Sequence, residues 1–240
     1  MKTVAFVLLA LLSATGNAVS FSSRVEQVPM IELYTSQGCS SCPPADDWLS
    51  GMTNHPGLWT ELIPIAFHVD YWDYIGWRDR FASPNHGQRQ RAYQRAGKVR
   101  SVYTPGLVVK GREWRGWFRG RKPDLVPGRS VGKLHLDLDG SQATIRFEPD
   151  GDAGNRPLQV HLALLGAGLS TPVGRGENEG KRLQEDFVVL GWTSTNGAGN
   201  GPWSLQLPET DVAPQRKAAV AWISAGDDPA PLQAVGGWLP

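Results

Sequence analysis

Two cysteines, Cys39 and Cys42, are the residues of this sequence with the clearest capacity for chemistry. They are the only cysteines in 240 residues, and Ser40 and Ser41 separate them. A thiol pair at this spacing can exchange a disulfide with another molecule or bind a soft metal ion. A disulfide that encloses so short a loop constrains the unfolded chain weakly, so a structural role explains the pair poorly. We therefore expect thiol–disulfide exchange, with Cys39 as the nucleophile and Cys42 as the resolving thiol.

The elements around the two cysteines favour this chemistry. Residues 28–35 read as a buried strand, Pro43 and Pro44 predict the first turn of a helix, and residues 62–69 predict a second strand. This order is typical of a βαβ unit with parallel strands. The dithiol would then lie at the N-terminus of the helix, where the partial positive charge stabilises a thiolate.

The N-terminal residues 1–19 predict a signal peptide. Lys2 precedes an apolar run over residues 4–12, and Gly16 and Ala18 stand at plausible cleavage positions. The run is shorter than the about 20 residues that span a bilayer. We expect export to the periplasm or the medium, an oxidising compartment, and no integral membrane segment after the signal is removed.

Overall charge gives no indication of a nucleic-acid partner. The chain has 24 Lys and Arg residues against 23 Asp and Glu, and it lacks the signals of a nucleic-acid-binding fold. Five arginines nevertheless cluster along one stretch, where they either form a solvated helix face or attract an acidic partner. They are Arg78, Arg80, Arg89, Arg91 and Arg95.

The second half of the chain reads as a separate β-rich segment. Apolar and polar residues alternate over 134–138 and again over 143–147, with Asp139-Gly140 between them, which predicts a hairpin. A change of composition at 123–129 suggests a linker. The expected organisation is an α/β domain over 24–128 and an all-β, sandwich-like domain over 130–240.

Several segments resemble the motifs of one family of secreted bacterial thioredoxin-like proteins, known as domain of unknown function 1223. The resemblance covers most of the chain after residue 19, and it implies an α/β thioredoxin-like N-terminal domain but no substrate. The matching segments are residues 31–46, 67–77, 81–84, 89–93, 102–105 and, more weakly, 176–180.

Thr104-Pro105 resembles the proline element of thioredoxin folds. There, a cis-proline before a later strand faces the dithiol, and the residue before it pairs its backbone with the substrate. We expect a cis bond here, and we expect Thr104 and Pro105 to take part in substrate binding.

His68 and Asp70 end the second predicted strand and share one face. Ligands of open α/β sheets bind at the carboxyl ends of the strands, so the two residues either support Cys42 as a proton acceptor or form a structural hydrogen-bonded pair. Four aromatic residues follow closely, and we expect most of them to pack, with one or two at the rim of the site. They are Tyr71, Trp72, Tyr74 and Trp77.

The function predicted from these features is that of an extracytoplasmic thiol–disulfide oxidoreductase. It would need no cofactor beyond its own disulfide, and its partner would be a protein or small molecule that carries a thiol or disulfide. Two alternatives remain open. Cys39, Cys42, His68 and Asp70 could bind zinc or copper in a metallochaperone-like protein, or the chain could be a non-catalytic binding module.

Overall fold

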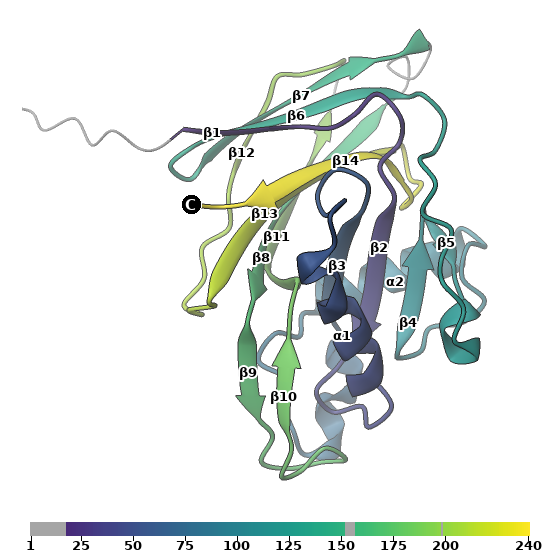
Figure 1. Ribbon diagram of the computed structural model, residues 1–240, viewed down its shortest axis with the longest axis vertical. Coiled ribbons are helices and arrows are strands. Elements are labelled where there is room, and N and C mark those ends of the chain that lie inside the picture. Colours follow the sequence, from purple (N-terminus) through teal and green to yellow (C-terminus); the bar gives the residue numbers. More distant parts are fainter. Residues whose placement is uncertain (1–17, 152–156, 198) are drawn as a thin grey trace, which may run out of the picture.

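The computed structural model describes residues 18–151, 157–197 and 199–240, so the signal peptide expected at 1–19 lies almost wholly outside the described residues. Strands dominate this part of the chain (Figure 1). They are β1 (Val19–Ser22), β2 (Met30–Thr35), β3 (Ile63–His68), β4 (Gly106–Val109), β5 (Arg112–Glu113), β6 (Gly132–Asp139), β7 (Gln142–Pro149), β8 (Leu158–Ala167), β9 (Leu169–Pro172), β10 (Arg182–Glu185), β11 (Val188–Gly197), β12 (Trp203–Gln206), β13 (Arg216–Ala225) and β14 (Pro231–Trp238).

These strands form three sheets. Eight strands lie in the order β14-β13-β8-β11-β3-β2-β4-β5, and four lie in the order β1-β6-β7-β12. The third sheet is the hairpin of β9 and β10. The expected hairpin of β6 and β7 is present, with Asp139 opposite Gln142 beside the turn.

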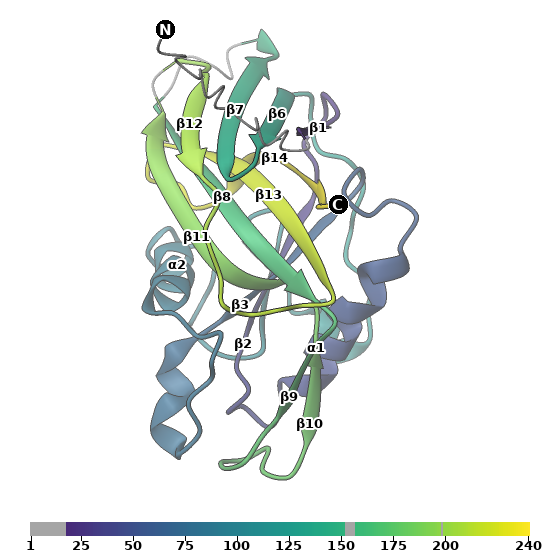
Figure 2. The ribbon, with the colours of Figure 1, turned by 90° about the vertical axis from the view of Figure 1, so that its left-hand side faces the viewer.

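The helices are short. They are α1 (Pro43–Ser50), α2 (Pro84–Arg95) and the 3-10 helices η1 (Gly51–Asn54), η2 (Asp70–Ile75) and η3 (Gly116–Arg119). A proline begins both α-helices, as expected of a residue that lacks the N–H left unpaired in the first turn. Figure 2 shows α1 and α2 on opposite sides of β2 and β3. No helix of the described residues is long and apolar enough to cross a membrane.

The expected α/β thioredoxin-like N-terminal domain is wrong for this structure. Strands make up 42% of the described residues and helices 16%. The parallel pair β2 and β3 joined through α1 is present, but the pattern does not continue. β4 runs antiparallel to β2, and the other edge of β3 pairs with β11 from the distant second half. The sequence contains one βαβ unit, but most of the later strands pair antiparallel and do not continue it.

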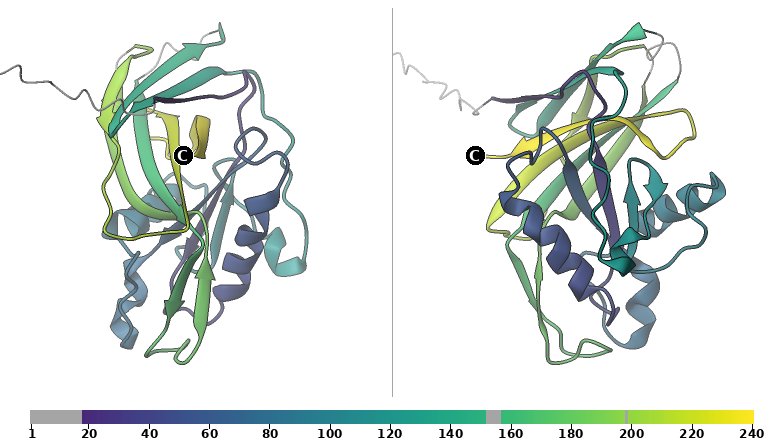
Figure 3. Two further views of the ribbon diagram at one scale, coloured as in Figure 1. Left: turned by 60° about the vertical axis from the view of Figure 1, so that its left-hand side comes forward. Right: turned by 45° about the vertical axis from the view of Figure 1, so that its right-hand side comes forward.

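Strands from both predicted segments meet in the eight-stranded sheet because β8 and β13 are apolar on both faces. Val160 and Ala221 pack into the core shared with the four-stranded sheet. Leu165 and Val220 pack into the core that includes Leu49 of α1. Strands buried on two faces read as nearly continuous apolar runs, which is the sequence of both strands. Figure 3 shows the resulting layers from two sides.

The hairpin of β9 and β10 projects beyond the end of the eight-stranded sheet (Figure 2). Its two arms join the sheet at Gly168 and Phe187, and both residues have left-handed backbones, with φ of 67° and 58°. The Gly168 N–H donates to the Asp186 carboxylate across 2.7 Å, which ties the two roots together. The hairpin thus leaves the sheet at two conformationally special residues.

Candidate functional site

Cys39 and Cys42 form a disulfide at the start of α1. Their Cα atoms lie 5.4 Å apart. Cys42 occupies the N-cap position, and its carbonyl oxygen accepts the backbone N–H of Ala45 and Asp46. Pro43 fixes the first turn directly after it. The structure thus places the dithiol at the helix N-terminus, as the sequence predicts.

Neither cysteine is accessible in this conformation, since both are 0% exposed. The serines between them are exposed at the surface. Gly38 permits a close approach from η2, because a Cβ at this position would lie 3.1 Å from the Ile75 side chain and 3.3 Å from that of Trp72. Because both sulfur atoms are buried, a reaction at either of them requires a local movement of the residues packed over the disulfide.

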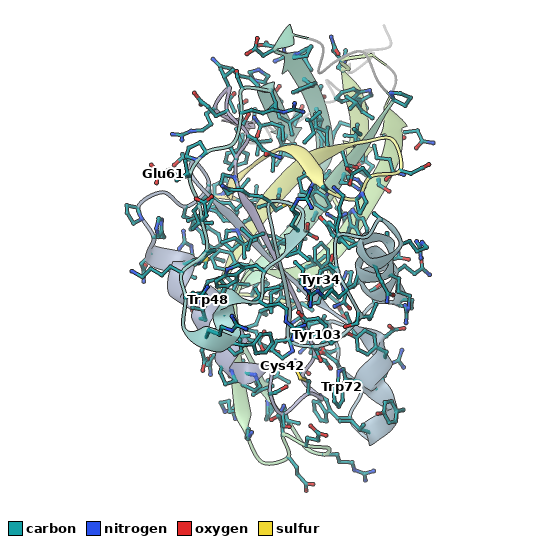
Figure 4. All side chains as sticks on the ribbon, turned by 90° about the vertical axis from the view of Figure 1, so that its right-hand side faces the viewer. Tyr34, Cys42, Trp48, Glu61, Trp72 and Tyr103 are labelled. Carbon is teal, nitrogen blue, oxygen red and sulfur yellow. A yellow bond between two sulfur atoms is a disulfide. The ribbon has the colours of Figure 1, made fainter. Side chains whose placement is uncertain are left out.

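Part of the surroundings comes from η2 and the Thr104-Pro105 segment. The peptide bond before Pro105 is cis, as expected. Trp72 Nε1 donates to Thr104 Oγ1 across 2.7 Å, so this tryptophan joins the segment to η2. Figure 4 shows the labelled Cys42, Trp72 and Tyr103 in the same region of the molecule. Trp72 therefore lies at the rim of the site, whereas Tyr74 is 82% exposed.

The tip of the β9–β10 hairpin lies against the turn that carries the dithiol. Asn178 is fully buried there, and its Nδ2 donates to the carbonyl oxygens of Gln37 and Cys39 at 2.9 and 3.0 Å. The Glu177 carboxylate accepts the Ser40 backbone N–H at 3.0 Å. Hydrogen bonding from Ser40 holds the pKa of Glu177 below its usual value. This tip is a second cover over Cys39.

Beneath the dithiol turn lies a buried polar layer centred on Gln37. Its backbone N–H donates to Asp79 at 2.9 Å, and its side-chain Nε2 donates to Glu185 at 2.8 Å and to Thr171 at 3.1 Å. Trp77 Nε1 donates to the Gln37 side-chain oxygen at 2.9 Å. Gln37 thus connects the dithiol turn with the loop after η2 and with both strands of the hairpin.

His68 is buried in this layer, but its partner is Asp79 and not Asp70. The distance from His68 Nδ1 to the Asp79 carboxylate is 2.7 Å. Burial alone would lower the pKa of His68, but Asp79, with Glu185 and Asp46 near it, raises this pKa to about 9. Burial opposes ionisation of Asp79 as well, yet His68 and the N–H groups that Asp79 accepts hold its pKa below the usual value. The two residues form an ion pair at neutral pH.

Asp46 contributes a second titratable group close to the dithiol. It lies one helical turn after Cys42, and Thr35 Oγ1 donates to its carboxylate across 3.0 Å. Desolvation, opposed by the positive charge of His68, raises the pKa of Asp46 to about 7. A carboxyl group with this pKa can exchange a proton near neutral pH.

The four donors of the alternative metal site are not gathered in one place. His68 uses its Nδ1 for Asp79, and Asp70 begins η2. Across the described ranges, no group of three or more His, Cys, Asp or Glu side chains is arranged to hold a metal ion. The predicted arginine face also differs, because Arg89 is buried and bonds Glu32 at 2.7 Å.

Sequence reasoning missed most of the residues that surround the dithiol. Asp79 and Glu185 come near it through tertiary contacts with Gln37, which no local pattern reports. Asp46 carried a usable signal, since it lies four residues after Cys42 and hence on the same face of the helix. Asn178 lies in the segment 176–180, which the sequence had marked only as a weak motif.

Comparison with known proteins matches residues 30–224 to the family described as protein of unknown function (DUF1223). A crystal structure of a protein from Agrobacterium tumefaciens is similar, with 26% identity and a TM-score of 0.61 over 89% of this chain and 95% of that one. HBP35 of Porphyromonas gingivalis shares the fold, with 14% identity and a TM-score of 0.59 over 90% of this chain and 76% of that one. No curated protein matches the chain.

Proposed function

Because this chain belongs to the DUF1223 family, whose description assigns no function, we propose its function from the site itself: it exchanges the Cys39–Cys42 disulfide with thiols or disulfides of a substrate outside the cytoplasm. The substrate is a protein or a small molecule. The proposed compartment follows from the signal peptide expected at residues 1–19.

The observation that carries this proposal is the disulfide between the two cysteines at the N-terminus of α1. The sequence separation of three residues makes it a weak staple for the unfolded chain. A helix N-terminus also favours the thiolate over the thiol once the disulfide opens. Reactivity explains this placement better than stability does.

The reduced protein would reduce a substrate disulfide in two steps. First, the Cys39 thiolate attacks one substrate sulfur, so that a mixed disulfide forms and the other substrate sulfur leaves as a thiolate. Then the Cys42 thiolate attacks Cys39, which closes the intramolecular disulfide and releases the second substrate thiolate. Two electrons pass to the substrate, and its thiolates take up protons from water. An external dithiol restores the reduced protein by the reverse exchange.

Asp46 is our candidate for the group that takes the proton of Cys42 in the second step. It follows Cys42 by one helical turn, and its pKa of about 7 suits proton transfer at neutral pH. His68 supports it electrostatically, since its positive charge opposes the rise of the Asp46 pKa. This assignment replaces the expected direct role of His68 and Asp70.

An equilibrium redox titration against glutathione tests the proposal, with free thiols counted by maleimide labelling. A potential between about −270 and −120 mV would place the pair among catalytic dithiols. A potential below about −300 mV would mark an inert disulfide and overturn the proposal.

Single cysteine variants test the two roles. Cys42→Ser should trap a substrate as a mixed disulfide through Cys39, because the resolving thiol is missing. Cys39→Ser should trap none and should lose exchange activity while the protein stays folded. Full exchange activity in Cys39→Ser would show that the roles are assigned incorrectly.

A further inference from the structure

A cavity of about 590 Å³ lies beside η3 and β5, the edge strand of the eight-stranded sheet. Its lining is strongly basic, and Glu113 is the one carboxylate among the described residues that line it. The basic residues are Lys98, Arg100, Arg112, Arg115, Arg119 and Arg121. Because like charges repel one another at short range, this basic cavity favours an anionic occupant.

Little of this charge is neutralised within the protein. Lys98 Nζ lies 3.0 Å from the Asp228 carboxylate, whereas Arg115 is 3.5 Å from Glu113 at the surface. Glu113 also accepts the Tyr103 hydroxyl at 2.8 Å. One carboxylate shared in this way does not balance the cations around it.

Several arginines of the cavity have guanidinium groups without a partner among the described residues. The side chains of Arg112, Arg119 and Arg121 are exposed and make no ion pair or hydrogen bond within the part of the chain that the structure describes. Guanidinium groups present paired N–H donors that match the two oxygens of a carboxylate. They are therefore available to an external acidic group.

The basic character is local to this region. Residues 95–122 contain nine Lys and Arg residues and one acidic residue, whereas the whole chain has 24 basic and 23 acidic residues. Six of the nine basic residues line the cavity, so positive charge is concentrated there in a nearly neutral molecule. Such a surface steers and orients an oppositely charged partner.

One aromatic residue, Phe118, lines the cavity, and the ring of Tyr103 lies next to it. Phe118 is 49% exposed, and the Arg115 guanidinium lies over the rings of Phe118 and Tyr103, 5.8 and 5.4 Å from their centroids. An inorganic anion gains nothing from contact with an apolar ring, whereas a peptide with both acidic and apolar side chains can bury an apolar side chain against it. The concave shape also suits a short peptide segment better than the flat surface of a membrane.

The cavity is connected to the dithiol through consecutive residues. Tyr103 contacts the lining residue Arg115 and precedes Thr104, whose hydroxyl oxygen accepts the Trp72 Nε1–H at the rim of the site. Figure 4 shows Tyr103 and Trp72 in the region of Cys42. We propose that this basic cavity binds an acidic segment of the protein substrate whose disulfide the Cys39–Cys42 pair exchanges. The proposal rests on the proposed function.

Fluorescence anisotropy tests the binding directly. The probe is a short fluorescein-labelled peptide of glutamates around one phenylalanine, compared with the same peptide in which glutamine replaces glutamate. The glutamate peptide should bind, and its affinity should fall with added salt. Equal binding of both peptides, or binding of neither, would overturn the proposal.

Matched charge variants localise the site. The triple variant Arg112→Gln/Arg119→Gln/Arg121→Gln should bind the glutamate peptide about ten-fold more weakly or worse. The control Arg129→Gln/Lys133→Gln/Arg146→Gln removes the same charge from exposed positions outside the cavity and should keep the affinity. An equal loss in both variants would show a non-specific charge effect and contradict the proposal.

Two further measurements separate this inference from the proposed function. The double variant Cys39→Ser/Cys42→Ser should still bind the glutamate peptide, because binding does not need the thiols. If the wild type bound the peptide but had no exchange activity, the proposed function would fail while binding at the cavity would stand. The wild type should reduce a disulfide peptide with glutamates faster than one with glutamines. Equal rates for the two peptides would overturn the proposed role of the cavity and leave the exchange function intact. Tighter binding to phosphatidylglycerol vesicles than to the peptide would overturn the peptide proposal and assign this surface to membranes.

Discussion

Asn178 holds Cys39 although 139 positions separate the two residues in the sequence: its side-chain amide donates to the Cys39 carbonyl oxygen across 3.0 Å. The same amide also donates to the carbonyl oxygen of Gln37. The cover over the disulfide is thus fastened to the backbone of the turn that carries it, and the sulfur atoms themselves take no part in the attachment.

Removing this attachment should expose the disulfide. Asn178→Ala deletes two hydrogen bonds to buried carbonyl groups, worth about 1 kcal/mol each, so the rate of reduction by dithiothreitol should rise by up to about thirty-fold. Mass spectrometry after maleimide labelling measures this rate under native conditions. Glu179→Ala, at an exposed position in the same turn, is the control. An unchanged rate for Asn178→Ala would show that the hairpin tip does not limit access.

The raised pKa of Asp46 predicts how its replacement changes stability with pH. The folded protein holds a proton on Asp46 up to about pH 7, whereas the unfolded chain loses it near 3.8. Ionisation of Asp46 therefore lowers the free energy of unfolding as the pH rises from about 4 through 7. Asp46→Asn should be more stable than wild type at pH 8 by more than about 1 kcal/mol, and about equal near pH 4.

Urea unfolding at both pH values measures this difference. The exposed neighbour provides a matched control, since Asp47→Asn should give the same small change at each pH. If Asp46 also accepts the proton of Cys42, Asp46→Asn should slow exchange near pH 7 even though it stabilises the fold. Faster exchange in the variant would remove Asp46 from the reaction.

The His68–Asp79 ion pair should stabilise the fold within a defined pH window. The pKa of His68 is raised to about 9 from 6.5, so its contribution is fully present below 6.5 and disappears as the pH rises through 9. His68→Gln should lower the free energy of unfolding by about 3 kcal/mol at pH 6 and by much less at pH 10. The exposed His55 forms no ion pair among the described residues, and the effect of His55→Gln should not vary in this way.

The bond between Trp72 and Thr104 should matter for substrate binding. Trp72→Phe keeps an aromatic ring but loses the 2.7 Å hydrogen bond that positions Thr104, at about 1 kcal/mol. We expect a higher KM for a disulfide peptide and a smaller change in kcat. Tyr74→Phe, at an exposed position of η2, is the comparison, and an equal KM in both variants would count against a role for Thr104 in binding.

The local features of the site could be predicted because local chemistry determines them. Proline is favoured at the first position of a helix, and α1 begins at Pro43. The spacing of Cys39 and Cys42 is read directly from the sequence. The structure places His68 in the buried layer beneath the dithiol turn, and its partner there is Asp79 and not Asp70. Asp70 lies nearer in sequence, whereas the loop after η2 returns Asp79 to the histidine.

The fold could not be predicted in the same way because strand pairing is a tertiary choice. The apolar sequence of β3 indicates a central strand with a neighbouring strand on each edge, but it does not indicate which strands these are. One of these strands, β11, lies more than a hundred residues away in the sequence. No residue pattern in either segment predicts that Val188 pairs with Ala66. The four-stranded sheet likewise takes β1 from the N-terminal end of the described chain.

The left-handed residues Gly168 and Phe187 have a mechanical consequence for the hairpin of β9 and β10. The ladder of the eight-stranded sheet stops at them, and the hairpin has its own separate ladder. Pairing within the hairpin is therefore independent of pairing within the large sheet: separating the tip from the dithiol turn breaks its bonds to Gln37, Cys39 and Ser40 but no strand pairing of the large sheet.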